Sequence, residues 1–490
     1  MKAGMTSQND ADGKPPSQER CRELMVEATQ AGNLEIADAL RVTILQGIRT
    51  CRDHIVTNTE MPQAAFTAGR LNLLLKRFDD ALAFYCRAIR HMLDGTHCVA
   101  ADLLQQEADA IAHLQDSLDT PPQELQWVLD LLALARRVKP KQDALPTGLP
   151  PRALIVAGGA ATLDAAAVAR FRPLLEAALA PFTGTVVSGG TDIGIPGCVG
   201  DVTRELRQRG ACRYELIGYV PRKLLRDAPI HDAYDIRISG ESAFSAEQVL
   251  AGWRDLLDAD VVPEEVLCLG FGGGKVSSIE YRIALALGAT VAVVSAAPED
   301  AAARLVADPL WAGMPTLFPI PLDPQTVRAL VVVPSPHYPA QTLEQMAKSF
   351  HEEYVRNSTG KLPEPMKPWT ELAETYQIAN REQAKYAVQI LEACGFEVAE
   401  EESPDPKSVA FTDEEVEQMA RMEHGRWNVE RLRNGWRPGP RDDKTKRHPN
   451  LVPWDDASLD EPTKDYDRKS VRKFPEILAQ AGLEVRRVNH

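Results

Sequence analysis

Aromatic and basic residues gather in one stretch of this sequence, MEHGRWNVERLRNGWRPGPRDDKTKRHPN at 422–450. Residues 421–450 include nine Lys or Arg against four Asp or Glu, although the whole chain has a net charge of -15. Proteins hold nucleotides by stacking the base on an aromatic ring beside arginines. A compact patch suits a few phosphates better than a duplex, whose contacts would be spread along a stripe. The stretch therefore predicts a site for a small nucleotide and no extended nucleic acid.

The three tryptophans of this region are expected to play different parts. On a helix, Trp436 ends a stripe of four apolar residues, while Trp427 lies on the opposite side. We expect Trp436 and Trp454 in the core and Trp427 against a ligand. The alternatives are that the Trp427 side packs against a neighbouring unit and that His424 is a hydrogen-bonded structural residue. The candidate ligand-binding residues are His424, Trp427, Arg431, Arg441, Asp442, Lys446 and His448.

Glycines mark a second candidate site in the middle of the chain. Three clusters of two or three glycines each follow an apolar run, at the point where a strand would end. Glycine at such an end lets backbone N–H groups approach a phosphate, and the positive N-terminus of the next helix points at the same place. The candidate nucleotide-binding residues are Gly158, Gly159, Gly189, Gly190, Thr191, Gly194, Gly272, Gly273, Gly274, Lys275, Ser277 and Glu280.

Apolar runs and helical stretches alternate around these glycines. Strand-like runs are expected at 152–159, 184–194, 212–220, 264–274 and 289–296, with helices between them. Such alternation with continuous apolar strands predicts an α/β domain whose parallel sheet is covered on both faces.

Two familiar phosphate-binding motifs are absent from this domain. GFGGGKVS at 270–277 is one residue short of a P-loop and has Val276 where Ser or Thr would hold magnesium. No strand end carries GxGxxG followed by an acidic residue, which excludes the ordinary NAD-binding Rossmann motif. No metal site is expected either, because the eight cysteines are scattered without a CxxC pair.

The stretches SGGTDIGIPG (188–197) and GGGKVSSIE (272–280) resemble the SLOG superfamily. The most similar branch is LSDAT, which occurs in bacteria and in the cytoplasmic part of melastatin-type TRP channels. This resemblance implies a Rossmann-like domain at 152–335 that binds a nucleotide or an ADP-ribose-like ligand.

Enzymes of that superfamily release a base from a nucleoside monophosphate through a PGGxGTxxE motif. Aligned at Glu280, this sequence has Ser277 at the Thr of the motif and Val276 at a Gly, and it lacks the usual Arg-Lys pair. These departures weigh against an enzyme and favour Glu280 as a carboxylate that interacts with a helix N-terminus. The alternative is a nucleotide N-glycosidase or phosphohydrolase that uses Glu280 as acid and base near Lys275.

The C-terminal region, 340–490, contains two similar stretches, 343–398 and 416–485. In each stretch a histidine follows a methionine by five residues, at His351 and His424. We therefore expect two similar, mainly helical units related by a pseudo-twofold axis.

The second stretch, with GWRPGPRDDKTKRHPNLVPWDD at 435–456, strongly resembles the ryanodine receptor repeat (RyR) domain. That family has the same helix ending in GW, the basic stretch before HP, the LVPW segment and a closing helix. The resemblance implies a module that binds a nucleotide by stacking an adenine-like base on Trp.

Helical periodicity extends over 17–138, between a polar start at 1–16 that is expected to be disordered and a proline-rich linker at 139–151. Gly69 and Tyr85 stand at offsets typical of a tetratricopeptide (TPR) helix pair. The alternative is an unrelated helical bundle. A short array of this kind usually binds a partner protein or its own neighbouring domain.

The longest apolar run, 283–297, is too short to span a membrane and is split by Gly288.

The leading hypothesis is a cytoplasmic sensor for a nucleotide or NAD-derived signal, with a protein partner at the helical N-terminus. The combination of domains resembles bacterial conflict systems, which implies a role in defence signalling. The alternatives are the enzyme described above and a protein-interaction scaffold, and homo-oligomerisation stays open.

Overall fold

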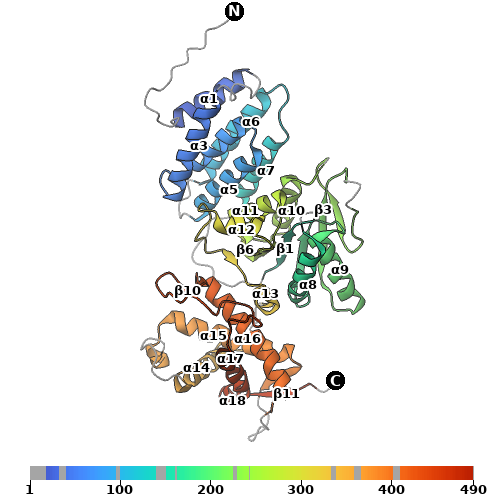
Figure 1. Ribbon diagram of the computed structural model, residues 1–490, viewed down its shortest axis with the longest axis vertical. Helices are drawn as coiled ribbons and strands as arrows, with labels where there is room; N and C mark the ends of the chain where they lie inside the picture. Colours follow the sequence, from blue (N-terminus) through green and yellow to red (C-terminus); the bar gives the residue numbers. More distant parts are fainter. Residues whose placement is uncertain are drawn as a thin grey trace, which may run out of the picture.

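The computed structural model contains three parts that follow one another along the long axis of the molecule (Figure 1). Helices form the N-terminal part, a sheet with its covering helices forms the middle, and further helices form the C-terminal part. The expected disordered start, 1–16, and residues 139–150 of the linker lie outside the described residues. The structure describes residues 18–31, 40–94, 100–138, 151–160, 163–224, 229–241, 243–332, 338–357, 366–400 and 409–488.

The N-terminal part is helical, as predicted. Gly69 of α4 lies against Tyr85 of α5, where a Cβ atom would be 2.7 Å from the ring. The Tyr85 hydroxyl donates to the buried Glu107 carboxylate at 2.8 Å. The small residue thus allows the two helices to pack closely. The helices are α1 (Gln18–Ala31), α3 (Arg41–Val56), α4 (Gln63–Leu74), α5 (Phe78–Asp94), α6 (Ala100–Ser117) and α7 (Glu124–Arg137).

The middle part is a seven-stranded parallel sheet in the order β4-β3-β2-β1-β5-β6-β7, which confirms the predicted Rossmann-like α/β fold. All five predicted strands are present, whereas β4 and β7 have only four and three residues and leave no clear pattern. The strand order reverses between β1 and β5. The strands are β1 (Ala153–Gly158), β2 (Thr183–Ser188), β3 (Arg213–Val220), β4 (Asp235–Ile238), β5 (Val266–Phe271), β6 (Thr290–Val294) and β7 (Leu317–Pro319).

Both faces of the sheet are covered because alternate strand residues point to opposite sides and both sets are apolar. Leu154 and Val156 belong to one buried cluster, and Ile155 and Ala157 belong to another. The N-terminal helices extend the second cluster, since α5 packs on α11 and α7 packs on α10. The first face carries α8 (Ala165–Leu179), α9 (Gly194–Gln208) and α13 (Pro324–Val331), and the second carries α10 (Ala246–Asp258), α11 (Lys275–Leu287) and α12 (Ala301–Ala307).

The C-terminal part consists of two units, each of which begins with a long helix and ends in a strand. One strand from each unit joins them, because β8 and β11 pair antiparallel with Val398 opposite Val485. The first unit contains α14 (Ala340–Asn357), the 3-10 turn η3 (Trp369–Glu371), α15 (Glu374–Ala393) and β8 (Phe396–Glu400). The second unit contains α16 (Asp413–Arg433), α17 (Glu461–Arg472), α18 (Phe474–Ala479) and β11 (Leu483–Arg487).

Both units hold a tryptophan by the same set of contacts. In the first unit, Trp369 donates its indole N–H to Glu344 at 3.0 Å, and Arg381 pairs with this carboxylate at 2.7 Å. The corresponding residues of the second unit are Trp454, Glu417 and Arg468, with both distances at 2.8 Å. The two units therefore have equivalent positions throughout this network.

Helix α13 connects the sheet to the C-terminal part, because it packs against α8 on one side and α16 on the other (Figure 1). Gly425 of α16 lies on the first turn of α13, where a Cβ atom would be 2.6 Å from the carbonyl oxygen of Gln325. Asn428 donates to the Thr326 hydroxyl at 3.1 Å. The apolar core under the first face of the sheet thus continues into the C-terminal helices.

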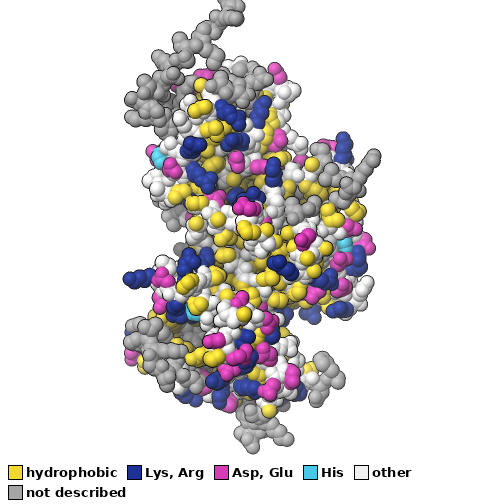
Figure 2. All heavy atoms as spheres, viewed as in Figure 1, with side chains coloured by type: hydrophobic (Ala, Val, Ile, Leu, Met, Phe, Trp, Pro, Cys, Tyr) yellow, Lys and Arg dark blue, Asp and Glu magenta, His cyan; other side chains and the backbone are white. Residues whose placement is uncertain are grey.

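The outer surface of the C-terminal part mixes charges of both signs. On the face shown in Figure 2, acidic and basic side chains are interspersed over this part of the molecule. Extended nucleic acid is usually bound along a basic stripe.

None of the helices in the part of the chain that the structure describes has the length and apolar character needed to cross a membrane.

Candidate functional site

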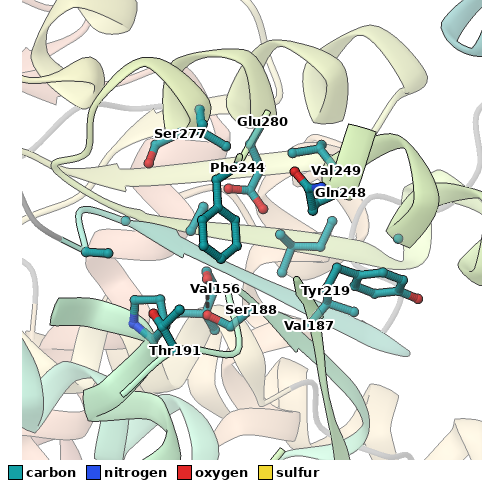
Figure 3. A pocket seen from close by; sticks show the side chains of 18 of the residues that line it. Val156, Val187, Ser188, Thr191, Tyr219, Phe244, Gln248, Val249, Ser277 and Glu280 are labelled. Atoms are coloured by element: carbon teal, nitrogen blue, oxygen red, sulfur yellow. Dashed lines mark hydrogen bonds between the residues drawn. The ribbon is translucent and has the colours of Figure 1, made fainter. Parts of the chain in front are cut away.

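A cavity of 280 Å³ lies where β1 and β2 end, between the sheet and the helices α10 and α11 (Figure 3). It is next to the point where the strand order reverses, and open α/β sheets bind ligands at such points. Eight of the twelve predicted nucleotide-binding residues line this cavity: Gly158, Gly159, Gly189, Thr191, Gly274, Lys275, Ser277 and Glu280.

The other four predicted residues shape the loops around the cavity without lining it. A side chain at Gly194 would collide with the backbone of Gly159, so Gly194 lets α9 start close to the end of β1. Gly272 and Gly273, with φ of 60° and 97°, turn the chain after β5, and their carbonyl oxygens accept from the first turn of α12. Gly190 packs against β3, where its Cα atom approaches Gly218.

Sequence reasoning missed the wall that α10 contributes. Gln248 and Trp253 of this helix line the cavity, together with Phe244 ahead of it and Tyr219 of β3. The apolar spacing of α10 is that of any helix covering a sheet, so no residue type in it indicated a ligand. The residue that could have indicated this wall is Phe244, an aromatic residue in an otherwise small and polar stretch.

Glu280 is the carboxyl group of this cavity. It lies in the second turn of α11, and Figure 3 shows its carboxylate directed into the cavity beside Phe244. Among the residues that the structure describes, Glu280 has no hydrogen-bond or ion-pair partner. Burial raises the pKa of Glu280 from 4.5 to about 7. The carboxyl group is therefore able to donate or accept a hydrogen bond, or a proton, at neutral pH.

The enzyme alternative places Glu280 near Lys275, and both residues line the cavity, but among the described residues no ion pair joins the two side chains. Lys275 is the exposed first residue of α11 and interacts electrostatically with Asp79 of α5. Five residues along a helix place two side chains about 140° apart. The expected interaction of Glu280 with the helix dipole is also wrong, because that effect is confined to the first turn. Burial alone accounts for the raised pKa of Glu280.

Within the described part of the chain, two residues of the cavity wall have a buried polar atom without a hydrogen-bond partner. These atoms are the Thr191 hydroxyl oxygen and the Trp253 indole nitrogen. By contrast, the Ser188 hydroxyl donates to the Val156 carbonyl at 2.8 Å. An unpaired buried polar atom costs about 1–3 kcal/mol. A molecule bound in the cavity is one way to recover that free energy.

Two helices next to the cavity begin without a side-chain cap. α9 follows Ile193 and α11 follows Gly274, and neither residue caps its helix through a side chain. Uncapped N-terminal N–H groups are suited to an anion such as phosphate. The other helices that cover the sheet, α8, α10, α12 and α13, are capped by Asp164, Ser245, Asp300 and Asp323.

The second predicted site is a tryptophan cluster in the second unit, formed by Trp427, Arg431, Trp436, Arg441 and His448. The Arg431 guanidinium lies 5.6 Å from the ring centroids of both Trp427 and Trp436. Arg441 lies 5.8 Å from the centroid of Trp436. His448 contacts both tryptophans edge-on, at 5.0 and 6.0 Å. The cations of this cluster are therefore already stacked on its rings.

The prediction that Trp436 belongs to the core is wrong. Helix α16 ends at Arg433, and Gly435 turns the chain at a φ of 81°. Helical spacing therefore does not apply to Trp436, which is half-buried. Trp427 is half-buried as well, whereas Trp454 is buried as predicted.

His424 and His448 differ in the direction of their pKa shifts. The Nε2 atom of His424 donates to the Val452 carbonyl at 3.0 Å, and its Nδ1 atom lies 3.4 Å from Asp467. Burial lowers the pKa of His424, but Asp467 raises it, and the net shift is upward. Burial lowers the pKa of His448 to about 4, with help from nearby Arg441. His424 thus matches the alternative of a hydrogen-bonded structural residue, and His448 is neutral at pH 7.

Asp442 and Lys446 hold the loop that carries the tryptophan cluster. Asp442 accepts from the Thr445 hydroxyl at 2.6 Å and from the Lys444 backbone N–H at 3.0 Å. Lys446 donates to the Asn434 carbonyl at 3.0 Å. These two predicted residues therefore stabilise the loop conformation.

Among the residues that the structure describes, the ring contacts of Trp427 are with His424, Arg431 and His448 of its own unit, and the alternative of a contact between units at Trp427 stays a prediction. The first unit meets α16 one turn before Trp427, where Gln383 donates to Glu423 at 3.1 Å. Glu423 is buried and pairs with Arg426 at 2.8 Å. Trp427 instead stacks on His424, with centroids 5.8 Å apart.

The fold and these two sites define an α/β protein with a Rossmann-like sheet and a helical part at each end. Residues 410–487, which include α16, the tryptophan cluster and β11, match the RyR domain family. The RyR resemblance is thus confirmed for the second unit. Comparison of the chain with curated proteins finds no match.

Proposed function

We propose that the protein is a sensor that binds a nucleotide or an ADP-ribose-like ligand in the cavity of a SLOG-type sheet domain. The observation that carries this proposal is the Glu280 carboxyl group, which lies in the cavity with its pKa raised by burial and with no partner among the described residues. Glu280 is partly buried, and a carboxyl group with little access to water that served only the fold would be expected to have a hydrogen-bond or charge partner.

The walls of the cavity suggest how such a ligand would lie. Lys275 is the one cationic side chain among the described lining residues, and it interacts with Asp79. Phosphates would therefore be held mainly by backbone N–H groups at the start of α11, because in α9 Pro196 has no N–H and the Ile195 N–H donates to the Gly159 carbonyl at 3.1 Å. The base or ribose would lie deeper, where Glu280 accepts hydrogen bonds from its donors and Trp253 supplies aromatic surface.

Transmission of the signal would use the N-terminal helices. The helices α10 and α11 form the cavity wall, and α7 and α5 pack directly on their outer sides. Arg137 pairs with Asp258 at 2.6 Å across this interface, and Arg87 donates to the Leu310 carbonyl at 2.9 Å. A TPR-type scaffold placed here would respond to the ligand, and cytoplasmic defence signalling is the setting that we propose.

Titration calorimetry on the full chain tests the proposal, with AMP, ADP-ribose, cyclic ADP-ribose and cyclic oligonucleotides as ligands. Val249 lines the cavity, and Val249→Phe fills part of its volume. We expect at least one of these ligands to bind, and the variant to weaken this binding by about tenfold or more, because lost contacts and displaced ligand atoms both reduce affinity.

The matched comparison is Trp427→Ala, which truncates the tryptophan cluster. Ligand binding that survives this change but not Val249→Phe supports the cavity. The reverse result would place the ligand on the RyR domain and refute the cavity as the sensor site. Absence of binding by every ligand would favour the scaffold alternative.

A nucleotide N-glycosidase or phosphohydrolase is the second candidate, because a carboxyl pKa of about 7 suits a general acid or base. Chromatography of AMP and NAD after incubation with the protein distinguishes this enzyme from the sensor. The sensor leaves both compounds intact. Release of a base or phosphate that Glu280→Gln abolishes would favour the enzyme instead.

A further inference from the structure

The first unit contains an open groove of 820 Å³ that no predicted site residue lines. It lies beside α14, next to the segment that leads into η3. Apolar parts of Val355, Met366 and Trp369 contribute to it, and His351 is buried at its edge. The full lining is Lys348, His351, Glu352, Val355, Arg356, Met366, Lys367, Pro368, Trp369, Thr370 and Gln480.

The equivalent groove of the second unit is filled by a segment of the chain itself. A shift of 73 residues relates His351 to His424, and it relates the groove residues of α14 to the face of α16 that receives α13. The first turn of α13, 323–326, occupies that face. The equivalent pairs are Lys348 with Arg421, His351 with His424, Glu352 with Gly425, Val355 with Asn428 and Arg356 with Val429.

The segment that fills the groove of the second unit places the carboxylate of Asp323 near Arg421. Asp323 is 4% exposed and caps α13 by accepting from the Thr326 backbone N–H at 2.7 Å. Its carboxylate interacts electrostatically with Arg421 and with His424. The groove of the second unit therefore recognises a polypeptide turn that presents a carboxylate.

Three differences in the first unit define what its groove would accept. Glu352 stands in place of Gly425, and a Cβ atom at Gly425 would collide with the backbone of α13. A helix therefore cannot approach the first unit as closely. Cationic Arg356 and Lys367 stand in place of Val429 and Val452, while Lys348 keeps the charge of Arg421; Arg356 pairs with Glu353 at 2.9 Å, and Lys348 lies 4.0 Å from Glu352.

We propose that this groove binds an acidic, extended segment of a partner protein. The equivalent groove of the second unit already holds a segment of polypeptide, which favours a peptide over a small molecule. The side chain at position 352 favours an extended backbone over a helix. Lys348 stands where Arg421 interacts with Asp323 in the second unit, which favours Asp and Glu in the occupant. This binding does not depend on a nucleotide in the sheet domain.

Fluorescence anisotropy with a labelled ten-residue peptide of Asp, Glu and Pro tests the proposal on the full chain. Lys348→Glu with Arg356→Glu reverses two charges of the groove, and we expect it to weaken binding about tenfold or more. The ion pairs of these residues, with Glu352 and Glu353, lie within α14 and are exposed or partly exposed, so the variant should keep its fold. Val355→Trp, which blocks the groove without changing its charge, should weaken binding as well.

The control variant changes the same charge elsewhere. Arg209→Glu with Lys469→Glu alters two exposed residues on α9 and α17. Equal weakening by this control would attribute binding to overall charge and overturn the proposal. A peptide that does not bind overturns it too, as does full displacement of the peptide by inorganic phosphate, which would indicate a site for small anions.

Discussion

Replacing Glu280 with Gln is expected to stabilise the protein at pH 8 by about 2–3 kcal/mol. The pKa of this buried carboxyl group is raised from 4.5 to about 7, so its ionisation is disfavoured in the folded protein relative to the unfolded chain. Glutamine has nearly the same shape and cannot ionise. The variant therefore avoids a charge that the cavity does not neutralise.

The stability difference between the wild type and Glu280→Gln depends on pH. Below pH 4.5 the carboxyl group is protonated in both states, so its ionisation does not contribute to the free energy of unfolding. Between pH 4.5 and about 7 the unfolded chain loses the proton first, and the wild type becomes progressively less stable than the variant. Above pH 7 the difference stays constant. Urea denaturation at pH 5, 6, 7 and 8 measures it.

The control for this experiment is Glu299→Gln at an exposed position. It removes a carboxyl group from the surface and should leave the free energy of unfolding within about 0.5 kcal/mol. Parallel stability curves for wild type and Glu280→Gln would contradict the prediction. A variant that is more stable and also loses ligand affinity would fit a binding residue, since function often requires an unfavourable charge.

Replacing Gly425 with Val is expected to destabilise the contact between the sheet domain and the RyR domain by about 3 kcal/mol. A Cβ atom there would lie 2.6 Å from the carbonyl oxygen of Gln325, and backbone atoms cannot rotate away as a side chain can. Helix α16 would have to move off α13. Calorimetry should then show the C-terminal part unfolding at a lower temperature than the rest.

The equivalent position of the first unit supplies the control. Glu352 is exposed on α14, so Glu352→Val should change the free energy of unfolding by about 0.5 kcal/mol or less. Limited proteolysis gives an independent measure, with faster cleavage between the two domains in Gly425→Val alone. Similar behaviour of the two variants would show that Gly425 is not needed for close packing.

The sequence predicted the sheet well because five of its strands are apolar and three of them are followed by glycines. It also predicted much of the cavity, since the glycines directly follow those three strands and Glu280 lies in the helix after the third of them. The α10 wall could not be predicted in the same way. Gln248 and Trp253 reach the cavity only because the helix crosses the sheet there, and this placement depends on long-range packing.

In the RyR domain, helical spacing predicted the position of one tryptophan correctly and of another wrongly. It correctly separated Trp427 from the core, because Trp427 lies within α16. It failed for Trp436, which follows the end of that helix at Arg433. The repeat in the sequence likewise predicted two similar units. It carried no information about α13, which packs against the second unit only through the folding of the whole chain.

The strand pair between the two units sets the size of the fragment that can fold alone. The match to the RyR domain family begins at residue 410, whereas β11 pairs with β8, Phe396–Glu400. A fragment cut at the family boundary would leave β11 with an unpaired edge, which promotes aggregation. Expression of the C-terminal part should therefore begin ahead of α14, so that the unit of folding includes both repeats although the unit of sequence similarity covers one.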